Sequence, residues 1–341
     1  MNFGGNIRLN KFGICIIIGL VCFMFLYISS SNKTEIEKKR IVSLKKLLIA
    51  AIETAIKGGR EVIDVYRESN LNERSKGKTK EGVDLPVTDA DMRSNCAMYY
   101  SLVHTFPDIK VISEEVTSES GCRTLQSLEL DQNNLKNGKD LGDEQVFSSS
   151  VTIWIDPLDA TKEFTENLLQ YVSTMVCVAV NGEPTIGVIH FPFAEEPMTV
   201  WGWVKRGVSP EIEKRVSAGD NNVVIVSKSH PGEVENVVRA TLGDSYKIIS
   251  AGGAGYKVLE VASKNVSAYI HTTVIKKWDI CAGNAILNAL GGQMTTLKNE
   301  RIDYSSSASP KNEDGILATL SRHSDFIEKF KSFSSSKKLS N

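Results

Sequence analysis

The sequence is short of the features that mark several common protein classes. Its 40 lysines and arginines balance 41 aspartates and glutamates, and this near-zero net charge argues against a dedicated nucleic-acid-binding surface. Its six cysteines form no CxxC pair, which argues against a zinc knuckle or a dithiol redox motif. No internal repeat, Ser-His-Asp nucleophile elbow, Walker loop or dinucleotide-binding GxGxxG is present either. The 341 residues, 41% of them hydrophobic, still suffice for one large or two moderate domains with a substantial core.

Charge is also missing from one long apolar run, residues 12–28, near the N-terminus. As a helix these residues would span roughly 25 Å, which suits the thinner membranes of the early secretory pathway. We predict a transmembrane signal-anchor at 12–28, a short tail at 1–11 before it and a stalk at 29–42 after it. A cleaved signal peptide is the alternative, because small residues at 29–31 offer a cleavage point.

The side of the membrane on which the body lies is not fixed by charge, because basic residues flank the run on both sides. Two Asn-x-Ser/Thr sequons, at Asn32 and Asn265, favour a glycosylated, lumenal body.

The body alternates helical and extended patterns. Residues 41–70 carry apolar side chains at helical spacing, either as one long helix interrupted at Gly58-Gly59 or as a pair of helices. Two extended runs, 171–180 and 183–190, are joined by Asn181-Gly182, which predicts a β-hairpin. The polar stretch 117–150 is predicted to be a flexible insertion, and the Ser/Lys-rich end, 333–341, a disordered tail.

A pair of aspartates directly follows a predicted buried strand at residues 151–155. The strand runs into Asp156-Pro-Leu-Asp159, whose two carboxylates can point into one pocket if a helical turn begins there. Mg²⁺ prefers oxygen ligands and retains water, so the turn suits a site where a metal, water and a substrate phosphate meet. The alternative is a helix start at which the carboxylates accept only backbone N–H bonds.

Acidic residues recur at the ends of other predicted elements. Each could be a helix cap or a solvated loop residue by itself, but a cluster of that charge persists only if cations neutralise it. The five residues are Asp91, Glu114, Asp156, Asp159 and Asp279.

A glycine-rich turn, Gly252-Gly-Ala-Gly255, precedes a predicted helix that begins near Tyr256. Backbone N–H groups at such a helix start can bind an anion, and Lys257 would add positive charge. Tight packing is the alternative reason for the glycines.

The sequence resembles the lithium-sensitive inositol monophosphatase superfamily through motifs between about 84 and 290. They are Val87-Thr-x-x-Asp91, Glu114-Glu115, Trp154-x-Asp-Pro-Leu-Asp-x-Thr161 and Trp278-Asp279-x-x-Ala282-Gly283. Ala160, the run 276–284 and the apolar leader are most similar to its Golgi branch, which acts on 3′-phosphoadenosine 5′-phosphate. The resemblance implies an α/β fold of layered αβαβα type and a catalytic domain at 43–332.

The same resemblance implies roles for particular residues. Two or three Mg²⁺ ions would be bound by Glu114, Asp156, the Leu158 carbonyl, Asp159 and Asp279. Asp91 and Thr161 would orient and deprotonate the attacking water. The nucleotide would contact Ser227, His230, Gly253 and Lys257.

The implied activity is release of the 3′-phosphate of 3′-phosphoadenosine 5′-phosphate to give AMP, in the Golgi lumen, where sulfotransferases generate that bisphosphate. A small-molecule partner follows from the same resemblance, and lithium sensitivity is a property of the resembled superfamily that the sequence does not fix for this chain. Membrane attachment rests on the run 12–28, and the oligomeric state and the disulfide pattern stay open. Two other functions remain: an inositol or sugar monophosphatase with the same metal core, and a membrane-tethered binding protein that has lost catalysis.

Overall fold

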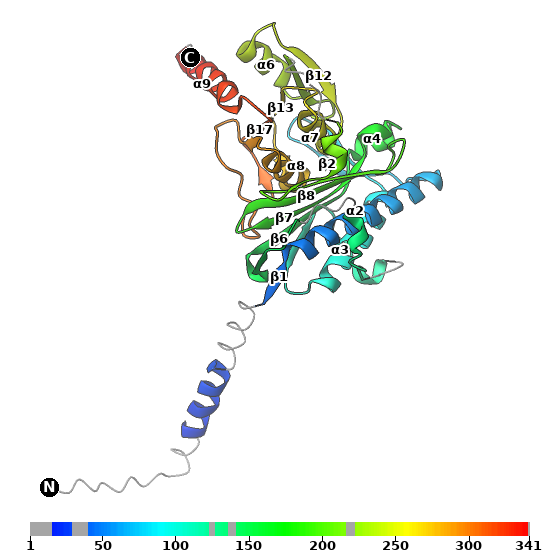
Figure 1. The fold of residues 1–341 in the computed structure, drawn as a ribbon, viewed down its shortest axis with the longest axis vertical. Helices are drawn as coiled ribbons and strands as arrows, with labels where there is room; N and C mark the ends of the chain where they lie inside the picture. Colours follow the sequence, from blue (N-terminus) through cyan, green and yellow to red (C-terminus); the bar gives the residue numbers. More distant parts are fainter. Residues whose placement is uncertain (1–15, 29–39, 123–126, 136–140, 216–221, 340–341) are drawn as a thin grey trace, which may run out of the picture.

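Two β-sheets alternate with three layers of helices in the computed structural model, which describes residues 16–28, 40–122, 127–135, 141–215 and 222–339 (Figure 1). The order of layers is α2 and α3, a six-stranded sheet, α7 and α8, a five-stranded sheet, and then α6 and α9. The predicted αβαβα architecture is therefore confirmed.

The six-stranded sheet has the order β10-β9-β8-β7-β6-β4. Glu114 directly follows one of its strands, and Asp156 and Asp159 lie on another. All neighbours are antiparallel except β4 and β6. The predicted hairpin is present, with Asn181 and Gly182 between β7 and β8. The strands are β4 (Lys110–Ser113), β6 (Val151–Asp159), β7 (Ser173–Val180), β8 (Glu183–Phe191), β9 (Met198–Trp203) and β10 (Gly207–Val208).

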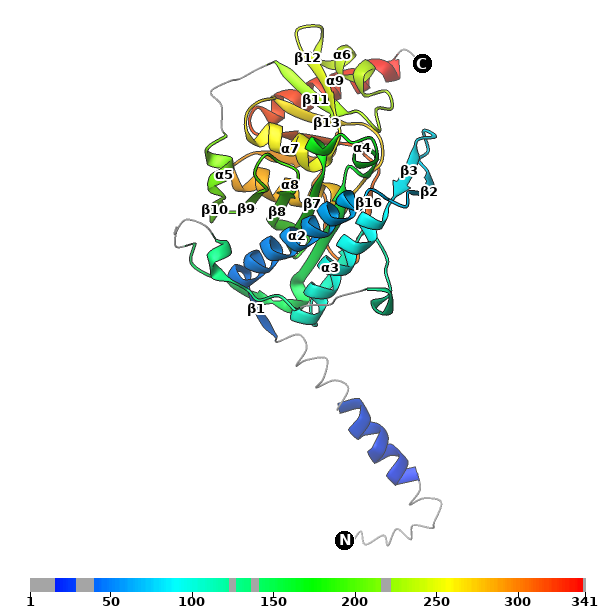
Figure 2. The same cartoon turned by 90° about the vertical axis from the view of Figure 1, so that its right-hand side faces the viewer.

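Helices α2 (Leu44–Arg67) and α3 (Asp89–Thr105) cover the outer face of this sheet (Figure 2). Helix α2 runs without a break through Gly58-Gly59, so neither the helix pair nor the interruption is present. A Cβ on Gly58 would come within 2.4 Å of Met98 Sδ, and one on Gly59 within 2.4 Å of His190 Cδ2. These glycines therefore permit close packing against α3 and β8.

The five-stranded sheet has the order β12-β11-β13-β17-β15. Helices α7 (Ala254–Ala262) and α8 (Lys277–Ala289) lie between the two sheets, in the largest apolar core. Helices α6 (Val234–Leu242) and α9 (His323–Leu339) cover the other face. The strands are β11 (Val223–Ser227), β12 (Lys247–Ala251), β13 (Ala268–His271), β15 (Gln293–Thr295) and β17 (Ile316–Thr319).

Short elements complete the chain. Strands β2 (Arg74–Lys78) and β3 (Asp84–Val87) form a hairpin that projects from the body, as Figure 2 shows. The others are β1 (Ile41–Ser43), β5 (Gln145–Phe147), β14 (Ile275–Lys276), β16 (Lys311–Asn312), α4 (Thr161–Thr165) and α5 (Pro210–Glu213).

The stretch 117–150, predicted to be a flexible insertion, is described at residues 117–122, 127–135 and 141–150. The described parts of this stretch include β5, which pairs with β1, and two buried leucines, Leu128 and Leu141. Their burial under α2 attaches the segment to the body, which its polar composition concealed.

The tail predicted from residue 333 falls largely within α9, which continues to Leu339. Phe326, Ile327 and Phe330 bury the first turns of this helix against the second sheet, and the Ser/Lys sequence extends a helix that packing has already nucleated.

Residues 16–28 of the predicted anchor are helical, and residues 12–15 lie outside the described part of the chain. No helix in the described ranges is long and apolar enough to cross a membrane.

Two disulfides, which the sequence left unassigned, stabilise the body. One joins Cys96 on α3 to Cys122, and the other joins Cys177 on β7 to Cys281 on α8. The second therefore links the six-stranded sheet to the helix that carries Asp279.

Candidate active site

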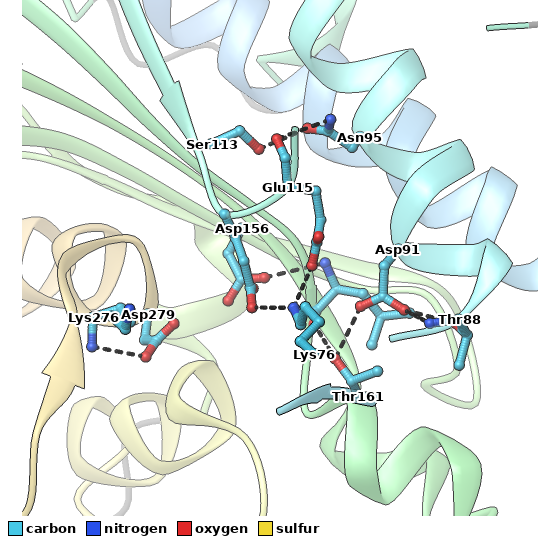
Figure 3. A network of polar contacts seen from close by, with 12 residues as sticks. Lys76, Thr88, Asp91, Asn95, Ser113, Glu115, Asp156, Thr161, Lys276 and Asp279 are labelled. Atoms are coloured by element: carbon cyan, nitrogen blue, oxygen red, sulfur yellow. Dashed lines mark hydrogen bonds and ion pairs between the residues drawn. The ribbon is translucent and has the colours of Figure 1, made fainter. Parts of the chain in front are cut away.

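Three carboxylates from three separate elements meet where β4, β6 and α8 come together (Figure 3). Glu114 follows β4, Asp156 lies on β6 and Asp279 lies in the first turn of α8. One oxygen from each lies within 4.8 Å of the others, and Asp156 is buried. The set supplies only oxygen donors, which fits Mg²⁺.

The turn after Trp154 bends because β6 loses its regular register with β7 between Asp156 and Asp159. The Leu158 N–H donates to Asp156 Oδ1 (3.1 Å), which fixes the turn locally. Ala160 then takes a left-handed φ of 71° before α4 begins. An L-residue adopts this conformation at a cost, so the surrounding contacts hold the turn in place.

The carboxylates destabilise one another in their charged form. Burial, and next the charge of Glu114, raises the pKa of Asp156 and that of Asp279 well above the ordinary range. A divalent cation would reverse this, because it favours the ionised forms that coordinate it.

Lys76 supplies a positive charge at this place. Its ammonium group, carried by the β2–β3 hairpin, donates to Glu114 Oε1 (2.8 Å) and forms an ion pair with Glu115. Burial opposes the charge of Lys76, but the two glutamates more than offset it and raise the lysine pKa. A protein cation in contact with these carboxylates is independent evidence that the group accommodates positive charge.

Sequence reasoning missed Lys76. Strand β4 ends at Ser113 and both glutamates lie in a bend, which allows the two adjacent side chains to reach the same lysine. No local signal in the sequence shows that Lys76 reaches Glu114.

Asp91 and Thr161, the predicted water-activating pair, are hydrogen-bonded. Thr161 Oγ1 lies 3.0 Å from Asp91 Oδ1 and 3.1 Å from the Leu158 carbonyl. Asp91 also accepts from Thr88 N–H and Oγ1, both at 2.7 Å, in a capping box at the start of α3. Burial raises the pKa of Asp91 to about 7. Asp91 can therefore cap α3 through one carboxylate oxygen and still contact Thr161 through the other.

Asp159 lies beside the three carboxylates but faces another way. Its carboxylate accepts from the N–H groups of Ala254 (3.0 Å) and Gly255 (2.8 Å), and from Ser173 Oγ (3.1 Å). Charge repulsion between Asp159 and Asp156 still contributes to the raised pKa of Asp156. The anion-binding start of α7 is thus confirmed as a motif, but in this structure its anion is the protein's own Asp159.

Lys257 lies beneath the glycine-rich turn and is only 3% exposed. Its ammonium group donates to the carbonyls of Gly253 (2.5 Å) and Ala251 (3.3 Å). Burial lowers the lysine pKa to about 8, against the charge of Asp159. Lys257 therefore stabilises the turn from below.

Ser227 and His230 lie at the end of β11, where the His230 N–H donates to Ser227 Oγ (3.1 Å). Burial lowers the pKa of His230, and the charges of Glu163 and Lys257 reach it as well. Gly253 has a φ of 62°, and a Cβ there would lie 2.5 Å from the Tyr171 carbonyl. The four predicted substrate contacts thus share one side of the acidic group.

A layered αβαβα body with convergent carboxylates at its strand ends defines the class of sugar-phosphatase-like proteins. The profile of the Inositol monophosphatase family matches residues 43–330, and the chain belongs to this family. Enzymes of the family are generally Mg²⁺-dependent phosphatases.

Relatives extend over most of the chain. "Putative inositol monophosphatase 3" of Drosophila melanogaster is 44% identical over 343 residues, covering 97% of this chain and 96% of that protein. "Inositol monophosphatase 3" of Danio rerio is 45% identical, over 92% of this chain and 93% of that protein. The "Golgi-resident adenosine 3′,5′-bisphosphate 3′-phosphatase" of Bos taurus is 45% identical, over 82% of this chain and 77% of that protein.

Solved structures agree on the fold. The extragenic suppressor protein suhB from Bartonella henselae superposes with a TM-score of 0.60 at 18% identity, covering 83% of this chain and 96% of that one. CysQ from Bacteroides thetaiotaomicron gives 0.58 at 20% identity, covering 82% and 98%.

Proposed function

We propose that the protein is a Mg²⁺-dependent phosphatase that removes the 3′-phosphate of 3′-phosphoadenosine 5′-phosphate and leaves AMP. The observation that carries the phosphatase reading is the Asp91–Thr161 hydrogen bond of 3.0 Å beside the carboxylates of Glu114, Asp156 and Asp279. The bovine relative, 45% identical, supports the nucleotide substrate through its name.

Each residue has a task in this reaction. Glu114, Asp156 and Asp279 would hold Mg²⁺, with Asp159 and the Leu158 carbonyl completing the ligand set. When bound, the ions supply positive charge that stabilises the phosphate and lowers the pKa of a bound water. Asp91 would accept a proton from an attacking water that Thr161 Oγ1 orients in line with phosphorus, and the electron pair of the broken P–O bond would stay on the 3′-oxygen of AMP, which takes up a proton from solvent.

The second phosphate and the nucleoside would lie over Ser227, His230 and the turn at Gly253. Lys257 acts from below, because its ammonium group is already bonded to the Gly253 carbonyl. An inositol monophosphate has no second phosphate or nucleoside to occupy this side, which favours the bisphosphate.

The proposal also includes the cellular compartment in which the catalytic body lies. We place the body in the Golgi lumen, attached through residues 12–28, where it would clear the by-product of sulfotransferases. The two disulfides suit an oxidising compartment, and relatives named Golgi-resident reach 45% identity.

The second candidate is an inositol monophosphatase, which the names of the Drosophila and Danio relatives favour. The two candidates are separated by kcat/KM for 3′-phosphoadenosine 5′-phosphate and for inositol 1-phosphate, measured with one preparation in Mg²⁺. We expect the bisphosphate to be preferred. Preference for the inositol ester would overturn the substrate assignment, and no turnover of either by folded protein would favour a binding function.

A further inference from the structure

Few large apolar side chains are exposed on the body. Beyond residue 40, the exposed ones among the described residues are Ile41 (60% exposed), Val116 (91%) and Phe147 (53%). Two of these three are neighbours, because Ile41 is paired with Phe147 across the β1–β5 ribbon. Cross-strand partners present their side chains on the same face.

The other face of the β1–β5 ribbon packs against the apolar core. Val42 pairs with Val146, and both pack against the apolar core beneath α2. The alternation of a strand therefore places Ile41 and Phe147 outward, at positions where a solvated ribbon carries polar residues. The pair is a small apolar patch at a place where few other large apolar side chains of the described body are exposed, and its location therefore decides its meaning.

The β1–β5 ribbon lies close in sequence to the N-terminal apolar run, and this position favours one contact partner for Ile41 and Phe147. β1 lies at the end of the body where its described chain begins, as Figure 1 shows. The apolar run 12–28 ends only 12 residues before Ile41, and these span at most roughly 40 Å when fully extended. The first surface of the body that a membrane anchored through this run would meet is therefore the ribbon.

We propose that Ile41 and Phe147 rest in the surface of the lipid bilayer and set the orientation of the catalytic body. The inference rests on the proposed membrane attachment. Apolar side chains that insert into the interfacial region bind a protein surface to the bilayer in proportion to the apolar area they bury.

The orientation has a consequence for the substrate. β5 leads through residues 148–150 into β6, and β6 carries Asp156 roughly 17 Å further along the strand from Val151. With the ribbon on the bilayer, the carboxylates lie at the end of β6 that is away from it. Such a site receives a substrate dissolved in the lumen, not one held in the membrane.

The test uses the full chain in phosphatidylcholine vesicles, with Phe147→Trp as the probe and Val116→Trp as the exposed control. Brominated phosphatidylcholine should remove most of the emission added by the tryptophan at 147 and none of that added at 116. Adding Ile41→Ser to the Phe147→Trp chain should reduce the quenching.

Three results would contradict the inference in different ways. Chains that do not float with the vesicles would refute the membrane attachment itself. Floating chains whose two probes are quenched equally, or not at all, would refute the bilayer contact alone. A detergent-solubilised dimer that Phe147→Ser converts to monomer would assign the pair to contact between two copies. Hydrolysis of 3′-phosphoadenosine 5′-phosphate by the same vesicles tests the catalytic proposal separately.

Discussion

The two sides of the site differ in how their charges are satisfied. On the metal side, Glu114, Asp156 and Asp279 face one another, and burial together with their mutual repulsion raises the pKa of the two aspartates. On the turn side, Asp159 is bonded to two α7 N–H groups and Lys257 to two carbonyls.

The difference separates residues that need a ligand from residues that hold the fold. The metal side is left with repulsion that a cation would relieve, whereas on the turn side hydrogen bonds and the charge of Lys257 offset part of the burial that raises the pKa of Asp159. Substitutions on the two sides should therefore have similar effects on catalysis and opposite effects on stability.

The largest effect is expected from Asp156→Asn and Asp159→Asn compared side by side. Each should lower kcat by at least about 10³-fold, because each would remove a ligand to ions that provide several kcal/mol of transition-state stabilisation. Urea unfolding without Mg²⁺ should show that Asp156→Asn raises the free energy of unfolding by roughly 1 kcal/mol. Asp159→Asn should lower it by about 2 kcal/mol, because charge-assisted bonds to α7 are lost.

If the two variants had equal free energies of unfolding, the proposed difference between the metal side and the turn side would be wrong. Near-normal turnover of either one would remove that residue from the metal assignment.

The two lysines give the next comparison. Lys257→Met should cost about 3 kcal/mol of unfolding free energy, since it leaves the buried carbonyls of Ala251 and Gly253 without their donor and removes a positive charge near Asp159. Lys76→Met should change stability by less than about 1 kcal/mol, because this lysine is an ion-pair partner near the surface. It should also tighten Mg²⁺ binding in calorimetry, because the competing ammonium is gone. Weaker Mg²⁺ binding by Lys76→Met would show that the lysine helps to assemble the site.

A smaller effect is expected from pH on the Mg²⁺-free protein. Burial raises the pKa of Asp91 from 3.8 to about 7, so across that interval the folded state holds a proton that the unfolded state has lost. Asp91 alone should therefore lower stability by up to about 3 kcal/mol as pH rises from about 4 to 7. Thermal unfolding at several pH values measures this, and Asp91→Asn should make the fall with pH shallower, while the raised pKa values of Asp156 and Asp279 maintain the rest of it. A profile that rises with pH would contradict the assignment.

The smallest effect concerns the turn itself. Ala160→Gly relieves the left-handed strain at a φ of 71° but adds freedom to the unfolded chain. The free energy of unfolding should rise by up to about 1 kcal/mol with kcat nearly unchanged. The thermal midpoint of the two proteins checks this, and a large loss of activity would show that the methyl group positions Thr161.

The sequence predicted those parts of the fold that depend on local pattern. Asn181-Gly182 marked the hairpin, and the periodicity of residues 44–67 marked α2. The predicted interruption at Gly58-Gly59 was wrong, because these glycines lie within the helix and allow Met98 and His190 of distant elements to pack closely against it.

For the site, ordered motifs identified the carboxylates, whereas their relative orientation needed tertiary structure. The direction of Asp159 depends on α7, almost a hundred residues later, and Lys76 reaches Glu114 only because the β2–β3 hairpin folds over it. Contacts between elements far apart in sequence leave no local signal.

The most direct test is to incubate the purified full chain with 3′-phosphoadenosine 5′-phosphate and separate the products by chromatography, with Mg²⁺ and with EDTA. We expect AMP and one phosphate per substrate in Mg²⁺, no product in EDTA, and none from Asp156→Asn. Loss of the 5′-phosphate instead, or equal product with and without Mg²⁺, would contradict the proposed reaction.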